Sequence, residues 1–473
     1  MIDISTLTIA SARRSLDAKE YSAADLAAAF LKEIEKKNPE VNAYLEVFSD
    51  VLDQAKAADA AIAKGEISPM TGIPLSIKDN ILIEGRIATS ASKILEGFRA
   101  PYSATAIEKL KAQKAVFLGR TNMDEFAMGG STENSAFGPT KNPHDLTRVP
   151  GGSSGGSVAS VAMHGALASL GSDTGGSVRE PSAFCGVVGL KPTYGGVSRH
   201  GLMAMGSSLD VIGPITNTVT DSEILFNAIR GKDPLDSTTF GDDIYEKRDS
   251  KKKMVIGVPY HILEKGLPKE TKDNFDAAIE KLKSLGYEIK SIELPNIEYS
   301  LAVYYIIVPA EVSSNLARFD GVKYGLHVDG KDLLDDYLKT RKAGFGKEVR
   351  RRILIGTYVL SAGYHDAYYN KALALRQKIS EDFAHAFQEV DVIATPTAPG
   401  PAFKIGEKIG DPLSLYLEDV FTVPANIVGI PAISIPSGTV YIDGHDLPLG
   451  LQLAAPHNCE NFLFEVGKKF LNE

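Results

Sequence analysis

Apolar positions along the chain recur in two patterns, one with the period of a helix and one in short continuous runs. Residues 21–41 show the first pattern, with apolar side chains returning every three or four positions and so sharing one helical face. Ser22 and Asp25 have the spacing of a capping box, and Pro39 marks the expected end of the helix. The pattern predicts an amphipathic helix that belongs to the scaffold.

Short apolar runs alternate with predicted helices over the next hundred residues. The stretch 72–85 predicts a strand that runs into a turn, and 106–126 predicts a helix followed by the strand 115–119. Residues 157–173 combine small and apolar side chains with almost no charge, which is typical of a helix or strand buried on all sides. This alternation indicates an α/β fold.

A strand–helix–strand unit is predicted later in the chain. Residues 254–260 and 287–295 resemble strands and 269–286 the helix between them, which favours a parallel pair with a right-handed crossover. Toward the C-terminus we expect two short buried strands and a terminal amphipathic helix, at 391–399, 431–438 and 458–473.

Composition places the chain among ordinary globular proteins. Its 473 residues are 44% hydrophobic and 23% charged, which disfavours disorder, coiled coils and fibres. The net charge is -9, so we do not expect this chain to be the main binding surface for a nucleic acid. Residues 231–253 are polar and charged, which indicates a surface excursion or the boundary of an insertion.

The cysteines and the N-terminus bear on the cellular compartment. Cys185 and Cys459 lie far apart and match neither a zinc nor a disulfide spacing, so we expect a reducing, cytoplasmic compartment and no metal site. The N-terminus has no apolar secretory core, and no apolar run approaches the ~18 residues of a membrane span. The sequence therefore predicts a soluble, cytoplasmic protein without membrane contact.

Two runs rich in glycine and serine carry the candidate chemistry. The run 148–160 has the composition of a flexible linker, but 171–181 repeats Gly-Gly-Ser soon afterwards, which a linker does not explain. A phosphate-binding loop needs the lysine of G-x-x-x-x-G-K-[ST], which both runs lack. Residues 151–155 match the G-x-S-x-G of a nucleophile elbow, but Pro150 disfavours the strand that an elbow follows.

A third interpretation uses both runs, as an anion-binding turn beside a nucleophile. Glycine lets backbone amides approach a ligand without a Cβ clash, and amides at a helix start point toward negative charge. The predicted oxyanion hole consists of the backbone amides of Thr174, Gly175, Gly176 and Ser177. In this interpretation the Ser177 hydroxyl is the nucleophile, and its ordinary alternative role is a helix N-cap.

A serine nucleophile needs a base, and no histidine lies in a recognisable frame. Lys78 is the candidate, because its apolar neighbours can exclude water and lower its pKa from ~10.4. Ser153 is the candidate relay between Lys78 and Ser177, with Ser154 as its rival. The ordinary alternatives are a surface lysine paired with Asp79 and a turn serine.

These segments resemble the amidase signature family. The combined motif is long and specific, since IKDN, GGSSGGS, GSDTGGSVR-x-P and GLKPT follow one another with the two serines 24 positions apart. The resemblance extends over nearly the whole chain and implies a mixed β-sheet core flanked by α-helices. It also implies a Ser-Ser-Lys triad, with Ser177 as nucleophile, Ser153 as bridging serine in a cis peptide, and Lys78 as base.

The resemblance leads us to expect a single amidase-signature domain over residues 1–473. Its expected parts are an N-terminal helical segment, a signature core, a surface elaboration and a return of the chain to the core, at 1–65, 66–230, 231–390 and 391–473.

Further segments are similar to the glutamine-hydrolysing subunits of tRNA-dependent amidotransferases within that family. They lie at 183–216, 313–325, 348–369 and 419–436. The resemblance implies that the chain hydrolyses glutamine and passes ammonia to the B subunit of a heterotrimer of A, B and C subunits. That partner would use ATP and Mg to transamidate Glu-tRNA(Gln) or Asp-tRNA(Asn), so no cofactor is expected on this chain and mischarged tRNA would bind through the partner.

The resemblance also assigns substrate contacts. Arg352 and Asp419 are implied to hold the α-carboxylate and α-amino group of glutamine, a zwitterion that needs one cation and one anion at a fixed separation. Arg350 and Arg351 are rivals for the first role, and a solvated charge run or a helix or turn cap are the ordinary alternatives. The implied substrate loop comprises Gly129, Gly130 and Ser131.

Two other functions stay open on the sequence. A free-standing amidase acting on another carboxamide would be active without partners. A catalytically silent scaffold subunit would need no triad, so the intact triad residues argue against it. Tyr304 and Tyr305 are left open between substrate contact and core packing.

Overall fold

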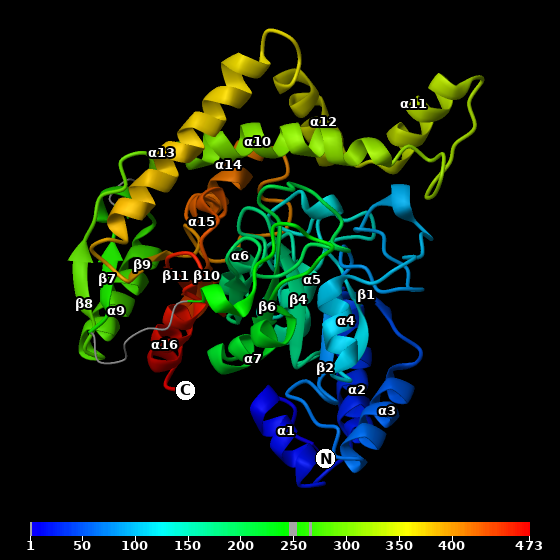
Figure 1. The fold of residues 1–473 in the computed structure, drawn as a ribbon, viewed down its shortest axis with the longest axis vertical. Helices are drawn as coiled ribbons and strands as arrows, with labels where there is room; N and C mark the ends of the chain where they lie inside the picture. The colour runs from blue at the N-terminus through cyan, green and yellow to red at the C-terminus, as the bar shows by residue number, and fades with distance from the viewer. Residues whose placement is uncertain (1, 246–252, 264–266) are drawn as a thin grey trace.

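An eleven-stranded sheet forms the centre of the computed structural model, which describes residues 2–245, 253–263 and 267–473 (Figure 1). The strands are β1 Tyr44–Val47, β2 Pro74–Lys78, β3 Val116–Thr121, β4 Ala168–Asp173, β5 Val188–Lys191, β6 Val211–Thr216, β7 Val255–Val258, β8 Glu288–Ser291, β9 Val392–Pro396, β10 Ala432–Ile442 and β11 His445–Ala454. Their order across the sheet is β1-β3-β2-β4-β6-β5-β10-β11-β9-β7-β8. The neighbours β3-β2-β4 and β9-β7-β8 are parallel and the others antiparallel, so the expected mixed sheet is confirmed.

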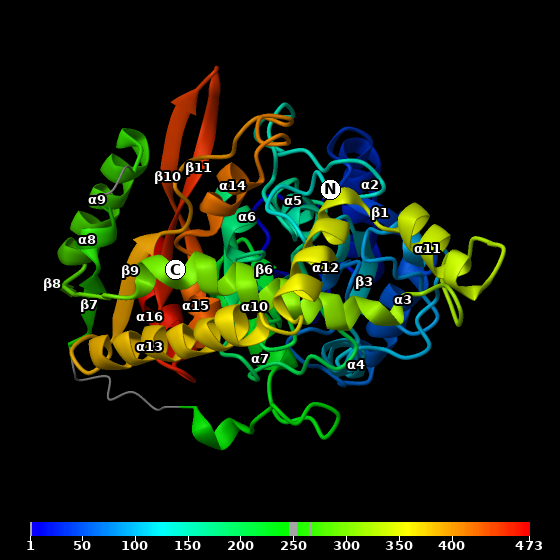
Figure 2. The same cartoon turned by 90° about the horizontal axis from the view of Figure 1, so that it is seen from above.

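α-Helices flank this sheet, as expected (Figures 1 and 2). They are α1 Ile9–Asp17, α2 Ala23–Val41, α3 Val51–Ala63, α4 Thr105–Ala112, α5 Gly155–Ala162, α6 Arg179–Phe184, α7 Val219–Ile229, α8 Tyr260–Leu263, α9 Lys269–Ser284, α10 Ser300–Asn315, α11 Leu333–Gly344, α12 Lys347–Val359, α13 Lys371–Ala386, α14 Pro412–Tyr416, α15 Val423–Val428 and α16 Glu460–Leu471. Helices α10, α12 and α13 lie across the top of the molecule in Figure 1, whereas α1, α2 and α3 lie at the bottom.

The first predicted helix is confirmed as α2, including its cap. The Ser22 hydroxyl accepts from the Asp25 amide at 3.0 Å, and the Asp25 carboxylate accepts from the Ser22 amide at 3.0 Å. The helix does not stop at Pro39 but continues to Val41, where Asn42 closes it in the left-handed conformation. Pro39 is tolerated there because it removes a single backbone donor in the last turn.

The strand and helix predictions before residue 174 are also confirmed. Strand β2 lies within 72–85 and β3 within 106–126, and α4 begins one residue before that second stretch, at Thr105. The stretch 157–173, for which helix and strand were both open, contains both, because the end of α5 is followed by β4. All six residues of β4 are buried, as the near absence of charge indicates.

In the C-terminal half, one predicted strand is wrong in length. The parallel pair β7 and β8, with α9 between them, is confirmed, and so are β9 and α16. Strand β10, however, runs well past the expected end at Gly438 and forms a long hairpin with β11, which was not predicted. A register shift between Pro436 and Gly438 lets the strand continue beyond the glycine, with its outer half exposed.

The polar stretch 231–253 is anchored where it is described, and its residues 246–252 lie outside the described residues. Asp233 accepts a hydrogen bond from the Ser198 hydroxyl at 2.5 Å, and Asp236 pairs with Arg199 at 2.9 Å. Beyond this stretch, the region 254–390 supplies two strands to the edge of the sheet and the helical layer of α10, α12 and α13.

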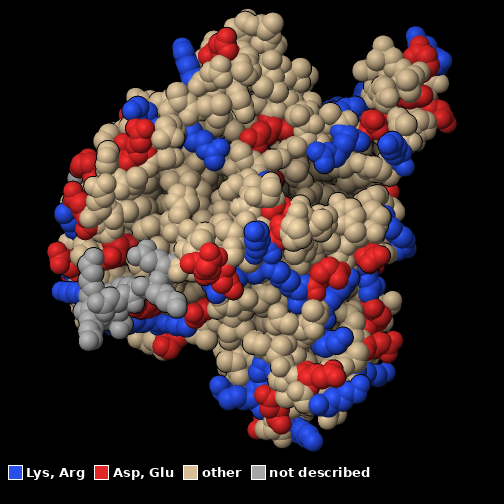
Figure 3. All heavy atoms as spheres, in the orientation of Figure 1, with Lys and Arg blue, Asp and Glu red and all other residues tan. Residues whose placement is uncertain are grey.

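The surface carries both signs of charge in the view of Figure 3, where basic and acidic side chains are interspersed. Cys185 and Cys459 are both buried, and no disulfide joins them. Within the described ranges, no helix has the length and apolar character needed to cross a bilayer.

Candidate active site

Two neighbouring parallel strands bring the predicted base and the second glycine run to one edge of the sheet. Strand β2 ends at Lys78, β4 ends at Asp173, and the two strands pair in parallel. Because the carboxyl ends of parallel strands lie at the same edge, Lys78 lies next to the loop that leads from Asp173 to Ser177.

The Lys78 side chain is fully buried and surrounded by oxygens. Its Nζ lies 2.8 Å from Ser153 Oγ, 2.7 Å from Ser154 Oγ, and 2.9 and 3.2 Å from the Oγ and carbonyl oxygen of Ser172. Asp79 pairs instead with Arg120 at 3.0 Å. The ordinary alternative, a surface lysine paired with Asp79, therefore does not describe this residue.

Burial lowers the pKa of Lys78 to about 7, although the carboxylates of Asp124, Asp173 and Asp210 act in the opposite direction. An ammonium group without water around it loses more free energy of solvation than these anions restore. A large fraction of the lysine is therefore a neutral amine near neutral pH, with a lone pair that can accept a proton.

The two serines in contact with Lys78 differ in their other partners. Ser154 Oγ donates to the Ser172 carbonyl at 3.1 Å and accepts from the Ser172 amide at 3.3 Å. The single hydroxyl proton of Ser154 is therefore directed to the Ser172 carbonyl. The hydrogen bond of Ser153 Oγ, in contrast, is the one it shares with Lys78 Nζ. The Gly152–Ser153 peptide bond is cis, as the family resemblance implies. Of the two serines, Ser153 has the hydroxyl that can relay a proton.

Ser177 is brought close to this pair through the backbone. The Ser154 amide donates to the Ser177 carbonyl at 3.1 Å, and Ser177 is 8% exposed. In the part of the chain that the structure describes, the hydroxyls of Ser153 and Ser177 do not hydrogen bond to each other. The segments of Ser153 and Ser177 are therefore adjacent, but the hydrogen bond between their hydroxyls that a proton relay needs is not formed in this structure.

The loop 174–177 differs from the predicted oxyanion hole in one residue. The Gly176 amide donates to the Asp173 carboxylate at 2.9 Å, so it is already engaged within the protein. The amides of Thr174, Gly175 and Ser177 remain candidates. Gly175 and Gly176 have no space for a side chain, because a Cβ would lie 2.7 Å from the Tyr304 ring and 2.2 Å from Thr422 Oγ1.

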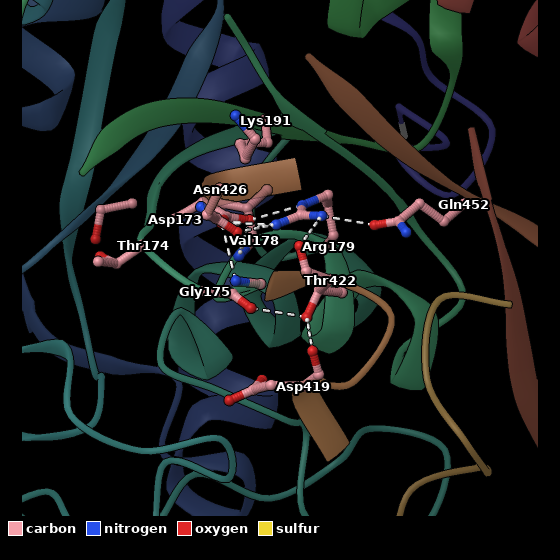
Figure 4. A network of polar contacts seen from close by, with 12 residues as sticks. Asp173, Thr174, Gly175, Val178, Arg179, Lys191, Asp419, Thr422, Asn426 and Gln452 are labelled. Atoms are coloured by element: carbon pink, nitrogen blue, oxygen red, sulfur yellow. Dashed lines mark hydrogen bonds and ion pairs between the residues drawn. The ribbon is translucent and has the colours of Figure 1, made fainter. Parts of the chain in front are cut away.

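A buried ion pair fixes the position of this loop (Figure 4). Arg179 binds Asp173 through two nitrogens, at 3.0 and 3.1 Å, and also donates to Gln452 and Asn426. Burial would raise the pKa of Asp173, but the Arg179 guanidinium outweighs it and lowers the pKa to about 2. Thr422 Oγ1 donates to the Gly175 carbonyl at 2.7 Å, which ties the loop to the segment beginning at Asp419.

Of the three consecutive arginines, the structure places one inside the molecule. Arg352 is 3% exposed, whereas Arg350 and Arg351 are exposed. Its Nε donates to Glu348 Oε1 at 2.8 Å, and its guanidinium carbon lies 5.3 Å from the centre of the Tyr305 ring. The cation is thereby held by an anion one turn away and by an aromatic face.

Asp419 also contacts Tyr305, whose hydroxyl donates to the Asp419 carboxylate at 3.3 Å. Loss of surrounding water raises the pKa of Asp419 to about 7, against the opposing charge of Arg352. The structure therefore brings together the cation and anion expected for a zwitterionic substrate, and Tyr305 contacts both. Tyr304 packs against Gly175 and is buried.

The predicted substrate loop lies beside the first glycine run. A Cβ on Gly152 would lie 2.6 Å from the Ser131 amide, and a Cβ on Gly129 would lie 2.4 Å from the Asp124 carboxyl. Gly130 faces the side chains of Leu415 and Glu180. The loop of Gly129, Gly130 and Ser131 thus lies next to the segment that carries Ser153.

Sequence reasoning missed several charged residues of the site. Glu348 could have been found, because it lies four residues before Arg352, the spacing of an ion pair on a helix. Arg179 lies inside the quoted motif without an assigned role. Asp124 and Glu180 carry no sequence signal of their own. Glu180 is fully buried, its Oε2 accepts from the Gly152 amide at 3.0 Å, and burial raises its pKa well above the usual range.

The buried lysine beside a serine pair on a mixed sheet defines a class of amide hydrolases, and comparison with known proteins confirms it. The chain belongs to the amidase family, since the model described as Amidase matches residues 25–464.

Relatives of nearly equal length have a more specific name. The chain is 52% identical over 470 residues to the A subunit of glutamyl-tRNA(Gln) amidotransferase from Desulfatibacillum aliphaticivorans, covering 98% of this chain and 96% of that protein. It is 54% identical over 427 residues to the protein of the same name from Thermodesulfovibrio yellowstonii, covering 89% and 88%.

Solved structures share the fold with this chain. The crystal structure of the glutamyl-tRNA(Gln) amidotransferase A subunit from Thermotoga maritima has a TM-score of 0.78 at 43% identity and covers 99% of this chain and 94% of that one. Native peptide amidase from Stenotrophomonas maltophilia has a TM-score of 0.83 at 26% identity, covering 99% and 97%.

Proposed function

We propose that this chain is the glutaminase subunit of a tRNA-dependent amidotransferase and acts in the cytoplasm. The observation that carries the proposal is 52% identity over 98% of the chain to an amidotransferase A subunit. The contact between buried Lys78 and Ser153 supports an active rather than a silent subunit.

In the proposed reaction, neutral Lys78 is the base. The Ser177 hydroxyl attacks the side-chain amide carbon of glutamine, its proton passes to Ser153 Oγ, and the Ser153 proton passes to Lys78 Nζ. The Ser172 carbonyl can only accept, so it keeps one Lys78 N–H directed toward it and leaves the lone pair for the Ser153 hydroxyl.

Collapse of the tetrahedral intermediate reverses the relay. Lys78 returns its proton through Ser153 to the departing nitrogen, the carbon–nitrogen bond breaks, and ammonia leaves. Water then attacks the acyl ester on Ser177 with the same base and releases glutamate. The amides of Thr174, Gly175 and Ser177 are the proposed donors to the oxyanion.

Recognition of glutamine is assigned to two charged residues that contact Tyr305. Arg352 is proposed to bind the α-carboxylate and Asp419 the α-amino group, because the guanidinium presents a planar pair of donors and the carboxylate accepts from an ammonium. Buried placement of Arg352, in contrast to exposed Arg350 and Arg351, supports this choice.

The proposed complex contains B and C subunits beside this chain. The B subunit would use ATP and Mg and the ammonia from this site to convert Glu-tRNA(Gln) to Gln-tRNA(Gln), or Asp-tRNA(Asn) to Asn-tRNA(Asn). A net charge of -9 fits a subunit that leaves the tRNA to its partner.

Substitution of the nucleophile tests this proposal. In the reconstituted complex, Ser177→Ala should abolish glutamine hydrolysis and glutamine-dependent transamidation, because no acyl ester can form. Transamidation with ammonium chloride should continue, since the partner site is intact. Release of glutamate and formation of aminoacyl-tRNA are the two measurements.

Two outcomes would contradict the proposal. Loss of ammonia-dependent transamidation in the Ser177→Ala complex would contradict the transfer of free ammonia between subunits. Rapid hydrolysis of other carboxamides by the isolated chain, without glutamine preference, would instead assign a free-standing amidase.

A further inference from the structure

Asp124 stands at a junction of three parts of the site, although the reaction described above does not use it. It follows β3 and its side chain is fully buried. Its carboxylate accepts hydrogen bonds from the amides of Thr132 at 2.8 Å, Asn134 at 3.1 Å and Ser131 at 3.3 Å. A single carboxylate therefore fixes the backbone that continues from the proposed substrate loop.

The same residue contacts the segment that carries the proton relay. The Asp124 amide donates to the Ser153 carbonyl at 3.2 Å. A Cβ on Gly152 would lie 2.2 Å from Asp124 Oδ2, so the carboxylate packs directly on that glycine. Residue 152 must be glycine for this approach, because any larger residue would overlap the carboxylate.

Asp124 also acts on the base through its charge. Three carboxylates from different elements contribute to the electrostatics at Lys78: Asp124 after β3, Asp173 at the end of β4, and Asp210 before β6. Each of them stabilises the ammonium form of Lys78. Asp173 is neutralised by Arg179, whereas Asp124 is held by backbone amides without an arginine or lysine in direct contact among the described residues.

We propose that Asp124 is a positioning residue that couples substrate binding to the proton relay, holding the substrate loop with its carboxylate and the Ser153 segment with its amide while its charge acts on Lys78. The expected change in glutamine binding rests on the proposed function, whereas the expected effect of Asp124 on Lys78 does not. Movement of the substrate loop would change the position of the carboxylate and with it the proton affinity of Lys78.

The test compares wild type with Asp124→Asn in the full chain by two measurements. The first is the rate at which phenylmethylsulfonyl fluoride labels Ser177 between pH 5 and 9, which reports the neutral base without glutamine. The second is the KM for glutamine in the reconstituted complex. Both proteins are first compared by circular dichroism and thermal melting.

Removal of the negative charge makes protonation of Lys78 less favourable. The acid limb of the labelling profile, which is the pH range over which the rate rises from its low value at acid pH, should therefore move to lower pH. We expect a shift of about one pH unit, the lower end of what a nearby opposite charge produces. The KM for glutamine should rise about tenfold, because the asparagine side chain offers one acceptor oxygen to three amides.

A matched control is Asp221→Asn on α7. Asp221 is also fully buried and also accepts from a backbone amide, that of Ile9 at 2.9 Å. Burial raises the pKa of both carboxyl groups, those of Asp124 and Asp221, to about 6. Replacement of Asp221 should leave the acid limb and the KM unchanged, which separates the loss of a buried carboxylate in general from loss at this site.

An unchanged acid limb in folded Asp124→Asn would overturn the inference, even if activity falls, because a purely structural role predicts that result. If Asp124→Asn does not fold, Asp124→Ser provides a smaller neutral side chain with room for a water molecule, and the limb must move in the same direction. Wild type that is labelled by the reagent but does not hydrolyse glutamine would refute the proposed function and leave the labelling test intact.

Discussion

At the scale of the residue, the proposed chemistry depends on which of the serine hydroxyls around Lys78 still has a proton to transfer. Lys78 contacts three serine hydroxyls, yet Ser154 and Ser172 also bond to each other or to neighbouring groups. The sequence could predict a lysine with apolar neighbours and two adjacent serines. It could not decide between Ser153 and Ser154, because that choice depends on contacts with Ser172, eighteen residues further along.

The two neighbouring serines should therefore respond differently to substitution. Ser153→Ala should lower kcat for glutamine about 100-fold or more, which is the usual loss when a proton-transfer group is removed. Ser154→Ala should have a much smaller effect on kcat, because its hydroxyl proton is directed to the Ser172 carbonyl. Steady-state kinetics of both variants would check this, and equal losses would contradict the assignment of Ser153 as relay.

At the scale of the element, helices α10 and α12 carry residues of the proposed substrate site. Helix α10 carries Tyr304 and Tyr305, and α12 carries Glu348 and Arg352. Their backbones touch, since a Cβ on Gly356 would lie 1.8 Å from the Pro309 carbonyl oxygen. A glycine one turn beyond Arg352 thus sets the approach of the two helices.

Gly356→Ala should push these helices apart. The added methyl group meets backbone rather than a flexible side chain, so we expect a loss of about 1–3 kcal/mol in the free energy of unfolding. The KM for glutamine should rise because Arg352 and Tyr305 move relative to each other. Denaturant titration and steady-state kinetics measure the two effects.

The adjacent Thr357→Ala is the control, since Thr357 is exposed on the same helix. It should change neither quantity appreciably. A Gly356→Ala variant that melts like wild type and keeps its KM would show that the helix contact does not position the substrate groups.

Element predictions succeeded where periodicity was strong and failed where the pattern was interrupted. The capping box of α2 and the strand–helix–strand unit of β7, α9 and β8 were evident in the sequence. The end of β10 was wrong because glycine usually interrupts a strand, and the register shift that carries the strand across Gly438 leaves no mark in the sequence. Helix α10 is apolar on several faces and contains Pro309, so it lacks the amphipathic period.

At the scale of the whole molecule, two lysines are fully buried among the described residues, Lys78 and Lys191. Burial lowers the pKa of Lys191 to about 7, and the nearby Arg179 acts in the same direction. An unfolded lysine titrates near ~10.4. Between these values the unfolded chain binds a proton that the folded chain has lost, so stability should rise as pH increases from 7 to 10.

Lys191→Met should reduce this gain. The variant lacks the group that binds a proton in the unfolded chain but not in the folded chain across that window, while Lys78 remains as in wild type. We expect the rise in unfolding free energy between pH 7 and pH 10 to be smaller by an amount on the order of 4 kcal/mol. Urea midpoints at both pH values measure it, and an identical rise in wild type and variant would refute the assignment.

The groups proposed for bond cleavage and those proposed for amino-acid recognition come from separate stretches of this molecule. Lys78, Ser153 and Ser177 come from the strands and loops of the first half, whereas Tyr305, Arg352 and Asp419 come from the helical layer and the segment after it. Such modularity lets ligand preference diverge by changes in the second stretch while the hydrolytic apparatus is inherited intact. One scaffold can then be shared by proteins named for different molecules, such as the peptide amidase and the tRNA-dependent amidotransferase.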